Sequence, residues 1–374
     1  MGEPLNIGII GCGAIVAQYL QTLPSLPAVR LHAVADLDFS RAQAVAAGQD
    51  GVKALSVDEL LADPAVDTVL NLTIPAAHAE VALRAIAAGK HIYGEKPLAA
   101  TTAEARTVLE RAAAAGVRVG CAPDTVLGTG IQTARHAIDA GVIGRPIAAT
   151  ATMVTPGHER WHPNPDFYYV PGGGPLLDMG PYYVTALVTL LGPVTSVIGA
   201  ASHLRTQRII GAGPRAGEAI PVAVDTHVTG VLVHESGALS TLVMSFDAVQ
   251  TRAANIEVHG ERASMSVPDP NWFDGEVSVS RLDDRDRGWE VLPDSAGYIG
   301  AGRGYGLADM AMTAPGEQHR ANGELAFHVL DVMESLLVSA QSGASVPVGS
   351  TAARPAGVPL TSLAEEPAGA RPAN

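Results

Sequence analysis

The stretch "NIGIIGCGAIVAQYL", residues 6–20, joins an apolar run, a glycine-containing turn and a helix-like segment. Gly11 permits a tight turn, and Gly13 lets backbone amides come close to a pyrophosphate. The free N–H groups at the start of the helix would face that negative charge. Val16 stands at the third position of the G-x-G-x-x-G/A pattern, which serves helix-to-strand packing. We therefore interpret the stretch as a dinucleotide-binding loop whose helix is slightly shifted.

A carboxylate follows at the spacing that such a loop requires. Asp36 ends the next strand-like run, 36 − 16 = 20 residues beyond the motif, and can accept both ribose hydroxyls of an adenosine. It would repel a 2′-phosphate, whereas Arg41 keeps that alternative open. The sequence predicts NAD as the cofactor, with NADP less favoured, and places Ala14 and Ile15 beside the glycines in the cofactor loop.

Strand-like apolar runs alternate with Ala-rich helical segments over the first third of the chain. This alternation predicts an α/β fold, a Rossmann-type doubly wound parallel sheet with helices on both faces, over residues 1–125. Thr101 and Glu104 form a capping box that opens one of these helices. The strand-like runs are Leu5–Ile10, Leu31–Ala35, Thr68–Leu72, His91–Tyr93 and Val117–Cys121.

Strand-like runs dominate from about Ile147 onward and indicate a second α/β domain, residues 126–350, with a mostly antiparallel sheet. Three helices accompany it, at Gly128–Ala140, Leu176–Leu191 and Glu324–Ala340. A Pro/Ala-rich tail, residues 351–374, is either an extended return strand or loosely ordered. The strand-like runs are Ala148–Val154, Val222–Val233, Ala238–Phe246, Asn255–Val258 and Glu276–Val279.

The charge balance excludes several classes of protein. The 374 residues hold 24 Lys plus Arg against 38 Asp plus Glu, a net charge of −14, which would repel a nucleic-acid backbone. Two cysteines, Cys12 and Cys121, give neither a disulfide framework nor a zinc pattern and are expected to be buried free thiols. The sequence shows no signal peptide and no apolar run long enough for a membrane helix. We expect a cytoplasmic protein without nucleic-acid or membrane partners.

Two further stretches make a family recognisable. They are "TIPAAHAEVALRAIAAGKHIYGEKPLA", residues 73–99, and "PGGGPLLDMGPYY", residues 171–183. Together with the glycine loop they resemble the glucose–fructose oxidoreductase and inositol dehydrogenase family, Gfo/Idh/MocA, over roughly residues 5–345. The resemblance implies a Rossmann domain and a second domain with an open sheet that often forms subunit contacts. A homodimer or homotetramer is then expected.

The resemblance also implies roles for the first of these stretches. Glu95-Lys96-Pro97 matches the family's Glu-Lys-Pro signature, with Lys96 at the catalytic centre and commonly a cis bond before the proline. His78 either supports the nicotinamide side of the site from behind or contacts it directly. The further cofactor contacts expected by resemblance are Thr73, Pro75, His78, Glu95 and Lys96.

The second stretch departs from the family pattern. Asp178 is present, but Tyr182 stands where the family usually has histidine, as in its glucose–fructose oxidoreductase and dihydrodiol or xylose dehydrogenase branches. Residues four apart share a helix face, so both side chains can reach one site even if Pro181 disturbs the turn. This departure leaves open the acid/base assignment and an inositol dehydrogenase activity.

Oxidation of an alcohol requires a base for the hydroxyl proton while a hydride leaves the carbon. A free tyrosine has a pKa near 10, and a nearby ammonium favours its phenolate form. We therefore expect Tyr182 to accept the proton, Lys96 to assist it and donate to the substrate oxygen, and Asp178 to orient substrate or lysine. The reverse assignment, with Lys96 as base and Tyr182 only a hydrogen-bonding wall, stays open.

The segment "GHERWHPNPDFYYVPGGG", residues 157–174, is rich in side chains that can hold a sugar. Trp161 or Tyr168 could stack on a ring face, and His162 could bind hydroxyls. The alternative for Trp161 and His162 is loop packing. Because prolines follow His162, a metal site with His158 is not expected. A weaker signal for the cleft lies in Asp124 and Gly300–Tyr305.

These features predict an NAD-dependent dehydrogenase or reductase that acts on a sugar, cyclic polyol or sugar derivative. Two other classes remain open. One is a glycoside-cleaving enzyme that oxidises a ring hydroxyl transiently and returns the hydride, as some family members do. The other is a non-catalytic NAD-binding regulatory protein, against which the presence of Lys96, Asp178 and Tyr182 together argues.

Overall fold

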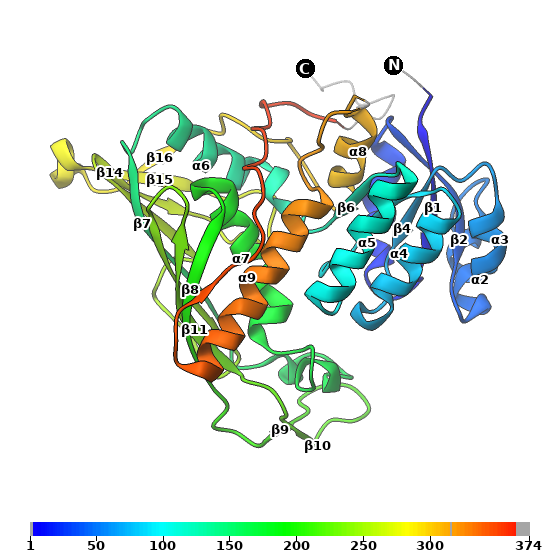
Figure 1. The fold of residues 1–374 in the computed structure, drawn as a ribbon, viewed down its shortest axis with the longest axis horizontal. Coiled ribbons are helices and arrows are strands. Elements are labelled where there is room, and N and C mark those ends of the chain that lie inside the picture. Colours follow the sequence, from blue (N-terminus) through cyan, green and yellow to red (C-terminus); the bar gives the residue numbers. More distant parts are fainter. Residues whose placement is uncertain (1–2, 315, 364–374) are drawn as a thin grey trace, which may run out of the picture. The chain divides into compact units, whose positions relative to one another are not determined.

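The structure, a computed structural model, describes residues 3–314 and 316–363. The chain forms two compact units. The first comprises the described residues of Met1–Thr129, Ala296–Phe327 and Val358–Asn374, and the second comprises Gly130–Ser295 and His328–Gly357. Each unit has its own sheet (Figure 1).

The first unit is built on a six-stranded sheet in the order β3-β2-β1-β4-β5-β6, with every neighbouring pair parallel. This is the doubly wound strand order, whose reversal between β1 and β4 creates a crevice for a dinucleotide. The predicted Rossmann fold is confirmed. The strands are β1 (Leu5–Ile10), β2 (Val29–Ala35), β3 (Lys53–Ala54), β4 (Thr68–Asn71), β5 (His91–Gly94) and β6 (Val119–Cys121).

Helices connect these strands. In Figure 1, α4 and α5 pack side by side along the sheet. The Thr101 side chain accepts the Glu104 N–H, and the Glu104 side chain accepts the Thr101 N–H, so the predicted capping box is confirmed. The connecting helices are α1 (Val16–Thr22), α2 (Phe39–Ala47), α3 (Val57–Ala62), α4 (His78–Ala87) and α5 (Thr102–Ala115), and α8 (Tyr305–Met312) joins the same unit later in the chain.

The chain re-enters the first unit late in the sequence. The Cys121 N–H donates to the Ala321 carbonyl at 3.0 Å, and the Gly297 N–H donates to the Val358 carbonyl at 2.9 Å. The sequence predicted three continuous segments, 1–125, 126–350 and 351–374. The first unit instead also takes in Ala296–Phe327 and the described residues from Val358 onward. The first part of the tail is an extended return, and its residues 364–374 lie outside the described residues.

The second unit is built on a nine-stranded sheet in the order β16-β15-β14-β13-β7-β12-β11-β8-β17. The β7–β12 pair is parallel and the other pairs are antiparallel, as predicted for a mostly antiparallel sheet. The strands are β7 (Pro146–Val154), β8 (Val194–Ser202), β11 (His227–His234), β12 (Leu239–Ser245), β13 (Ile256–Gly260), β14 (Ala263–Val267), β15 (Val277–Arg281), β16 (Glu290–Leu292) and β17 (Val346–Pro347).

Three long helices belong with this sheet: α6 (Thr129–Asp139), α7 (Pro175–Leu191) and α9 (Gly323–Ser342). Gly199 of β8 lets α9 approach closely, because a Cβ there would lie 2.7 Å from the Leu336 carbonyl oxygen. The predicted strand Val222–Val233 is wrong at its start. A short pair, β9 (Gln207–Ile209) and β10 (Ala219–Pro221), ends before it, and β11 begins only at His227.

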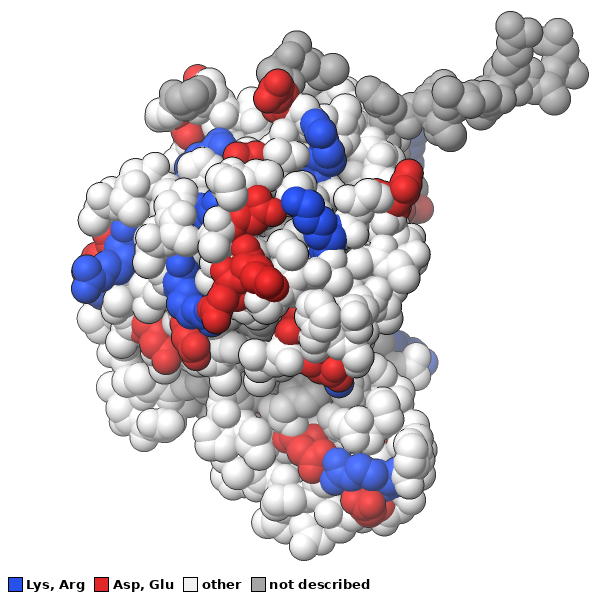
Figure 2. Space-filling model, turned by 90° about the vertical axis from the view of Figure 1, so that its right-hand side faces the viewer, with Lys and Arg blue, Asp and Glu red and all other residues white. Residues whose placement is uncertain are grey.

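Acidic and basic side chains are interspersed on the face shown in Figure 2. Opposite charges therefore neighbour one another there, although the whole chain carries a net charge of −14. Within residues 3–314 and 316–363, no helix combines the length and apolar character needed to cross a membrane.

Candidate active site

The loop after β1 has the geometry of a cofactor loop. Gly11 adopts φ +105°, and a Cβ there would lie 2.6 Å from the Leu72 backbone, so only glycine fits. A Cβ on Gly13 would meet nothing within 4 Å, and both Gly13 and Ala14 are exposed. Val16 is buried and begins α1. Val16, the larger residue at the third position of the motif, therefore packs between helix and strand and leaves the loop surface open.

Asp36 is held at the end of β2 by two backbone N–H groups. Its Oδ2 accepts from Cys12 at 2.7 Å, and its Oδ1 accepts from Asp38 at 2.9 Å. A carboxylate has about four acceptor sites, so this leaves capacity for two ribose hydroxyls. A cavity of about 310 Å³ opens here, lined by residues that include Gly11, Gly13, Asp36, Arg41, Thr73 and Arg84. These features fit the adenosine half of NAD.

The two arginines at this cavity have acidic partners. Arg41 lies 3.5 Å from Asp38, and Arg84 pairs with Asp58. Together with Asp36, these carboxylates offset the arginine charges, so a 2′-phosphate would gain little from the site. The arrangement favours NAD.

The Glu-Lys-Pro loop follows β5, two strands from β1 in the same sheet. Glu95 is 8% exposed, and its Oε1 accepts the Tyr19 hydroxyl at 2.8 Å while its Oε2 accepts the Lys96 N–H at 3.1 Å. Burial, aided by the adjacent Glu95 charge, raises the pKa of Tyr19 well above its usual value, so Tyr19 stays a neutral donor. The Lys96–Pro97 peptide bond is cis, as the resemblance implied.

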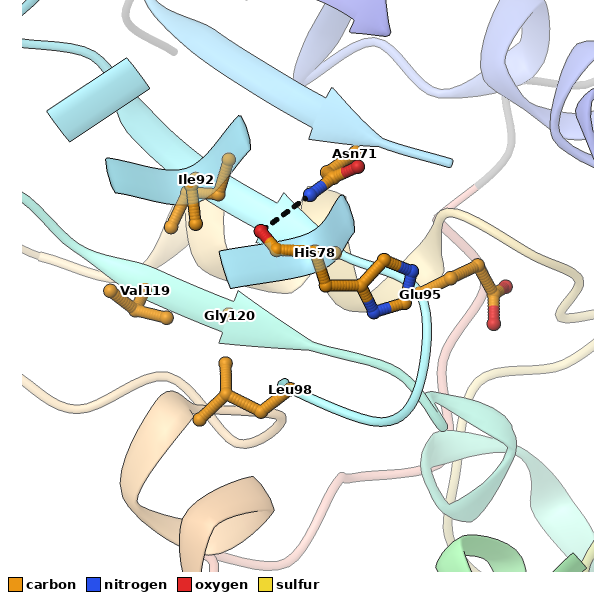
Figure 3. Close-up of a pocket in the computed structure, with 9 residues that line it drawn as sticks. Asn71, His78, Ile92, Glu95, Leu98, Val119 and Gly120 are labelled. Carbon is orange, nitrogen blue, oxygen red and sulfur yellow. Dashed lines mark hydrogen bonds between the residues drawn. The ribbon is translucent and has the colours of Figure 1, made fainter. Parts of the chain in front are cut away.

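His78 joins two loops at the edge of this sheet. Its Nδ1 lies 2.6 Å from the Pro97 carbonyl oxygen and its Nε2 lies 3.0 Å from that of Thr73. The ring is 2% exposed, and burial lowers its pKa. The Asn71 side chain donates to the His78 carbonyl at 3.1 Å (Figure 3) and accepts the Thr73 hydroxyl at 2.6 Å. His78 therefore lies between the two loops, and its neutral imidazole can donate a hydrogen bond to only one of the two carbonyls.

Asp124 and the segment around Gly304 also come together within the first unit. Asp124 is fully buried, and its Oδ2 accepts the N–H groups of Gly304 and Gly306, each at 3.0 Å. Burial raises the pKa of Asp124. The carboxylate thus anchors the start of α8.

Asp178 and Tyr182 lie one turn apart on α7 of the second unit. The helix runs unbroken through Pro181. Asp178 meets a partner that the sequence did not predict, because His158 Nε2 lies 3.1 Å from Asp178 Oδ2. The side chains of His158 and Asp178 are 12% and 18% exposed.

The loop between β7 and α7 gathers three of the predicted substrate residues, Trp161, His162 and Tyr168, into one aromatic cluster. The ring of His162 lies 5.4 Å from that of Trp161 and 5.6 Å from that of Tyr168. Trp161 is 59% exposed, so its ring can still meet a ligand. Among the described residues, no three His, Cys, Asp or Glu side chains are grouped to hold a metal ion.

Sequence signals explain some of these residues and not others. The glycines, Asp36, Lys96 and Asp178 belong to local spacing patterns. Tyr19, Asn71 and His158 do not. The partners of Tyr19 and His158 lie 76 and 20 residues away along the chain, whereas Asn71 bonds to Thr73 and His78 nearby. The one available signal for Tyr19 was its position on the buried side of the helix that follows the glycine loop.

Comparison with known protein families gives two matches. Residues 5–122 match the oxidoreductase family model with an NAD-binding Rossmann fold, and residues 131–266 match the GFO/IDH/MocA C-terminal domain. The two matches cover both units' principal segments.

Individual proteins agree with these matches. The chain is 31% identical to 1,5-anhydro-D-fructose reductase of Ensifer adhaerens over 69% of this chain and 74% of that protein. It is 28% identical to myo-inositol 2-dehydrogenase of Thermotoga maritima over 77% and 81%. An NAD binding oxidoreductase from Klebsiella pneumoniae has a similar structure, with a TM-score of 0.78, 27% identity, and coverage of 92% of this chain and 99% of that one.

Proposed function

The chain belongs to the GFO/IDH/MocA family of NAD-binding oxidoreductases, and from this premise we propose that it interconverts a secondary alcohol and a ketone on a sugar, cyclic polyol or sugar derivative. The main support for the proposal is that the cofactor loop and Lys96 lie at the same edge of the first sheet. The cofactor loop after β1 and Lys96 after β5 both lie at carboxyl ends of parallel strands, where ligands bind in such sheets. The named substrates of the relatives support the substrate class.

The residues that would hold NAD follow from the loop geometry. The backbone at Gly13, Ala14 and Ile15 would receive the pyrophosphate, and Asp36 would accept the ribose hydroxyls. When bound, NAD supplies the nicotinamide that takes or gives the hydride. On the nicotinamide side, Thr73, Pro75, Glu95 and Lys96 would form the contacts.

The catalytic roles rest on the register of the two motifs. Tyr182 would accept the hydroxyl proton of the substrate, Lys96 would donate a hydrogen bond to the substrate oxygen, and Asp178 would orient the substrate. Positioned proton transfer of this kind contributes roughly 10²–10⁴ in rate. The substrate ring would stack on Trp161 or Tyr168 and hydrogen-bond to His162. In the reverse assignment, Lys96 accepts the proton and Tyr182 only hydrogen-bonds.

The test is NADH absorbance of the purified protein with NAD and a panel of hexoses, pentoses, inositols, sugar acids and aryl glycosides, repeated with NADP. We expect NADH together with an oxidised, uncleaved product for one substrate class. Cleavage of a glycoside without net NADH would contradict the proposal and favour the redox-neutral reaction. NAD binding without any turnover would favour a regulatory role.

We also propose that the protein is a homodimer or homotetramer. Strands β8 and β12 of the second unit expose Ile198 and Leu239 on the same face of the sheet, each about half exposed. Exposed apolar residues grouped on one sheet are typical of an interaction surface. Sedimentation as a monomer at working concentration would contradict this assembly.

A further inference from the structure

The imidazole of His158 lies inside an aromatic cluster in the second unit. Its ring centroid is 4.4 Å from that of Phe246, 4.7 Å from that of Tyr168 and 5.3 Å from that of Trp161. The Tyr168 and Trp161 contacts are edge-to-face, an arrangement that aromatic rings prefer. These neighbours fix the plane of the imidazole, so each of its nitrogens has a defined direction.

Both nitrogens of His158 have polar neighbours of known character. Trp161 Nε1 donates to His158 Nδ1 at 3.3 Å, and His158 Nε2 lies 3.1 Å from Asp178 Oδ2. An indole N–H can only donate, so Nδ1 must be the unprotonated nitrogen. The ring proton is then on Nε2 and points at the carboxylate. An imidazolium would lose the Trp161 hydrogen bond, because Nδ1 would also carry a proton.

A buried guanidinium fixes the turn that carries His158. The side chain of Arg208 is 1% exposed and lies 3.2 Å from the carboxylate of Glu159, itself 4% exposed. The Arg208 guanidinium also donates to two backbone carbonyls and to a second carboxylate. Its further acceptors are Pro156 O at 3.2 Å, Phe246 O at 3.1 Å and Asp247 Oδ1 at 2.6 Å.

We propose that Trp161, His158 and Asp178 form a directed hydrogen-bond chain in which His158 is a positioning residue for Asp178. Each donor in the chain faces one acceptor, and the chain ends on the carboxylate. Asp178 is thereby held as a hydrogen-bond acceptor in one orientation. This inference rests on the proposed function, in which Asp178 orients the substrate.

The chain also links the carboxylate to the exposed ring of Trp161. A cyclic sugar or polyol has an apolar ring face that can stack on an indole. A ligand stacked on Trp161 would contact the indole whose N–H determines the tautomer of His158. The expected substrate is therefore a ring with one apolar face and a hydroxyl directed at Asp178, rather than an open-chain hydroxy acid.

The first test measures the tautomer and needs no substrate. Long-range proton–nitrogen NMR of the full chain with NAD bound, labelled at histidine nitrogen, should show His158 with its proton on Nε2 at neutral pH. Trp161→Phe keeps an aromatic ring and removes the N–H, so the single-tautomer signature should be lost. A proton on Nδ1, or an imidazolium, in the unaltered protein would overturn the inference whether or not the proposed function holds.

The second test is kinetic. His158→Leu removes the donor to a charged acceptor and should lower kcat/KM by about tenfold or more. His158→Gln retains an N–H donor and should recover most of that loss, which a merely structural role would not predict. The matched control is His203→Leu, which removes a histidine 3.0 Å from Asp225 on the surface of the same unit and should change kcat/KM less than twofold.

The outcomes separate the two proposals. Unchanged kcat/KM in His158→Leu, or no recovery in a folded His158→Gln, would overturn the positioning role and leave the dehydrogenase proposal standing. Failure of the unaltered protein to turn over any substrate would overturn the dehydrogenase proposal, and the NMR result would still decide the hydrogen-bond chain.

Discussion

We propose that the Asp36 side chain sets the preference for NAD over NADP. Its carboxylate is oriented by the N–H groups of Cys12 and Asp38 before any ligand binds. Asp36→Ser removes the charge and the paired acceptors. Hydrogen bonds to charged groups contribute about 1.5–3 kcal/mol, so the Kd for NAD should rise about tenfold or more and discrimination against NADP should relax.

Calorimetric titration with both cofactors measures this change. Asp50→Ser is the control, because Asp50 is exposed and does not line the cavity. Equal NAD affinity in the Asp36 variant and the unaltered protein would show that the carboxylate does not bind the ribose.

Tyr19 supports the Glu-Lys-Pro loop through its hydrogen bond to Glu95. Tyr19→Phe removes the hydroxyl that donates to the buried Glu95 carboxylate. A buried acceptor that loses its donor costs about 1–3 kcal/mol, so urea unfolding should show that loss of stability. Tyr305→Phe is the control, because its hydroxyl makes only a 3.3 Å bond to the Gly300 carbonyl. Equal losses in both variants would refute a special role for the Tyr19–Glu95 bond.

Residues whose chemistry depends on local spacing could be predicted from the sequence. Gly11, Asp36 and Lys96 lie in patterns only a few residues long or at a fixed offset along the chain. The interaction between His158 and Asp178 could not be predicted, because two short turns and several prolines lie between them and no periodicity relates the two positions. Such contacts depend on the path of the loop.

The elements themselves show the same division. The run Leu5–Ile10 is predicted to the residue, and the other four predicted runs of this sheet differ from their strands by one or two residues at one end. Such runs can be recognised because buried parallel strands are continuous apolar segments. The predicted start of β11 at Val222 was wrong, because residues 222–226 are apolar enough to resemble a strand. Their N–H groups instead go to other partners, such as that of Ala223 to the Tyr169 carbonyl. The returns near Gly297 and Val358 are single extended segments without a period.

The capping box of α5 offers a test at the level of one helix. Thr101→Ala removes the oxygen that accepts the Glu104 N–H, and loss of an N-cap typically costs about 1 kcal/mol. Thr101→Ser keeps that oxygen and should stay close to the unaltered protein. Chemical unfolding of both variants measures the difference, and equal stability of the alanine and serine variants would contradict the role of the cap.

The whole molecule should lose stability in mild acid, because each unit buries a neutral histidine. Burial lowers the pKa of His319 in the first unit and of His328 in the second to about 4. Between about pH 6.5 and 4 the unfolded chain binds these protons and the folded chain does not. The free energy of unfolding should therefore decrease as the pH is lowered through this range, by about 1.4 kcal/mol per pH unit for each histidine.

Urea unfolding at a series of pH values measures this slope. His328 accepts the Val194 N–H through Nε2, and His328→Gln keeps an acceptor that does not titrate in this range. The variant should show a shallower dependence on pH than the unaltered protein. Identical slopes would mean that His328 is not the titrating group.

The central proposal for the whole molecule is that the dinucleotide fold of the first unit serves alcohol chemistry at Lys96. The most direct measurement is turnover of the Lys96→Met variant with NAD and the best substrate of the panel, alongside NAD affinity and unfolding temperature. Lys53→Met, which replaces an exposed lysine of the same unit, is the control. We expect Lys96→Met to fold and bind NAD but to lose at least about 10²-fold in kcat. Near-full turnover in that folded variant would contradict the proposal.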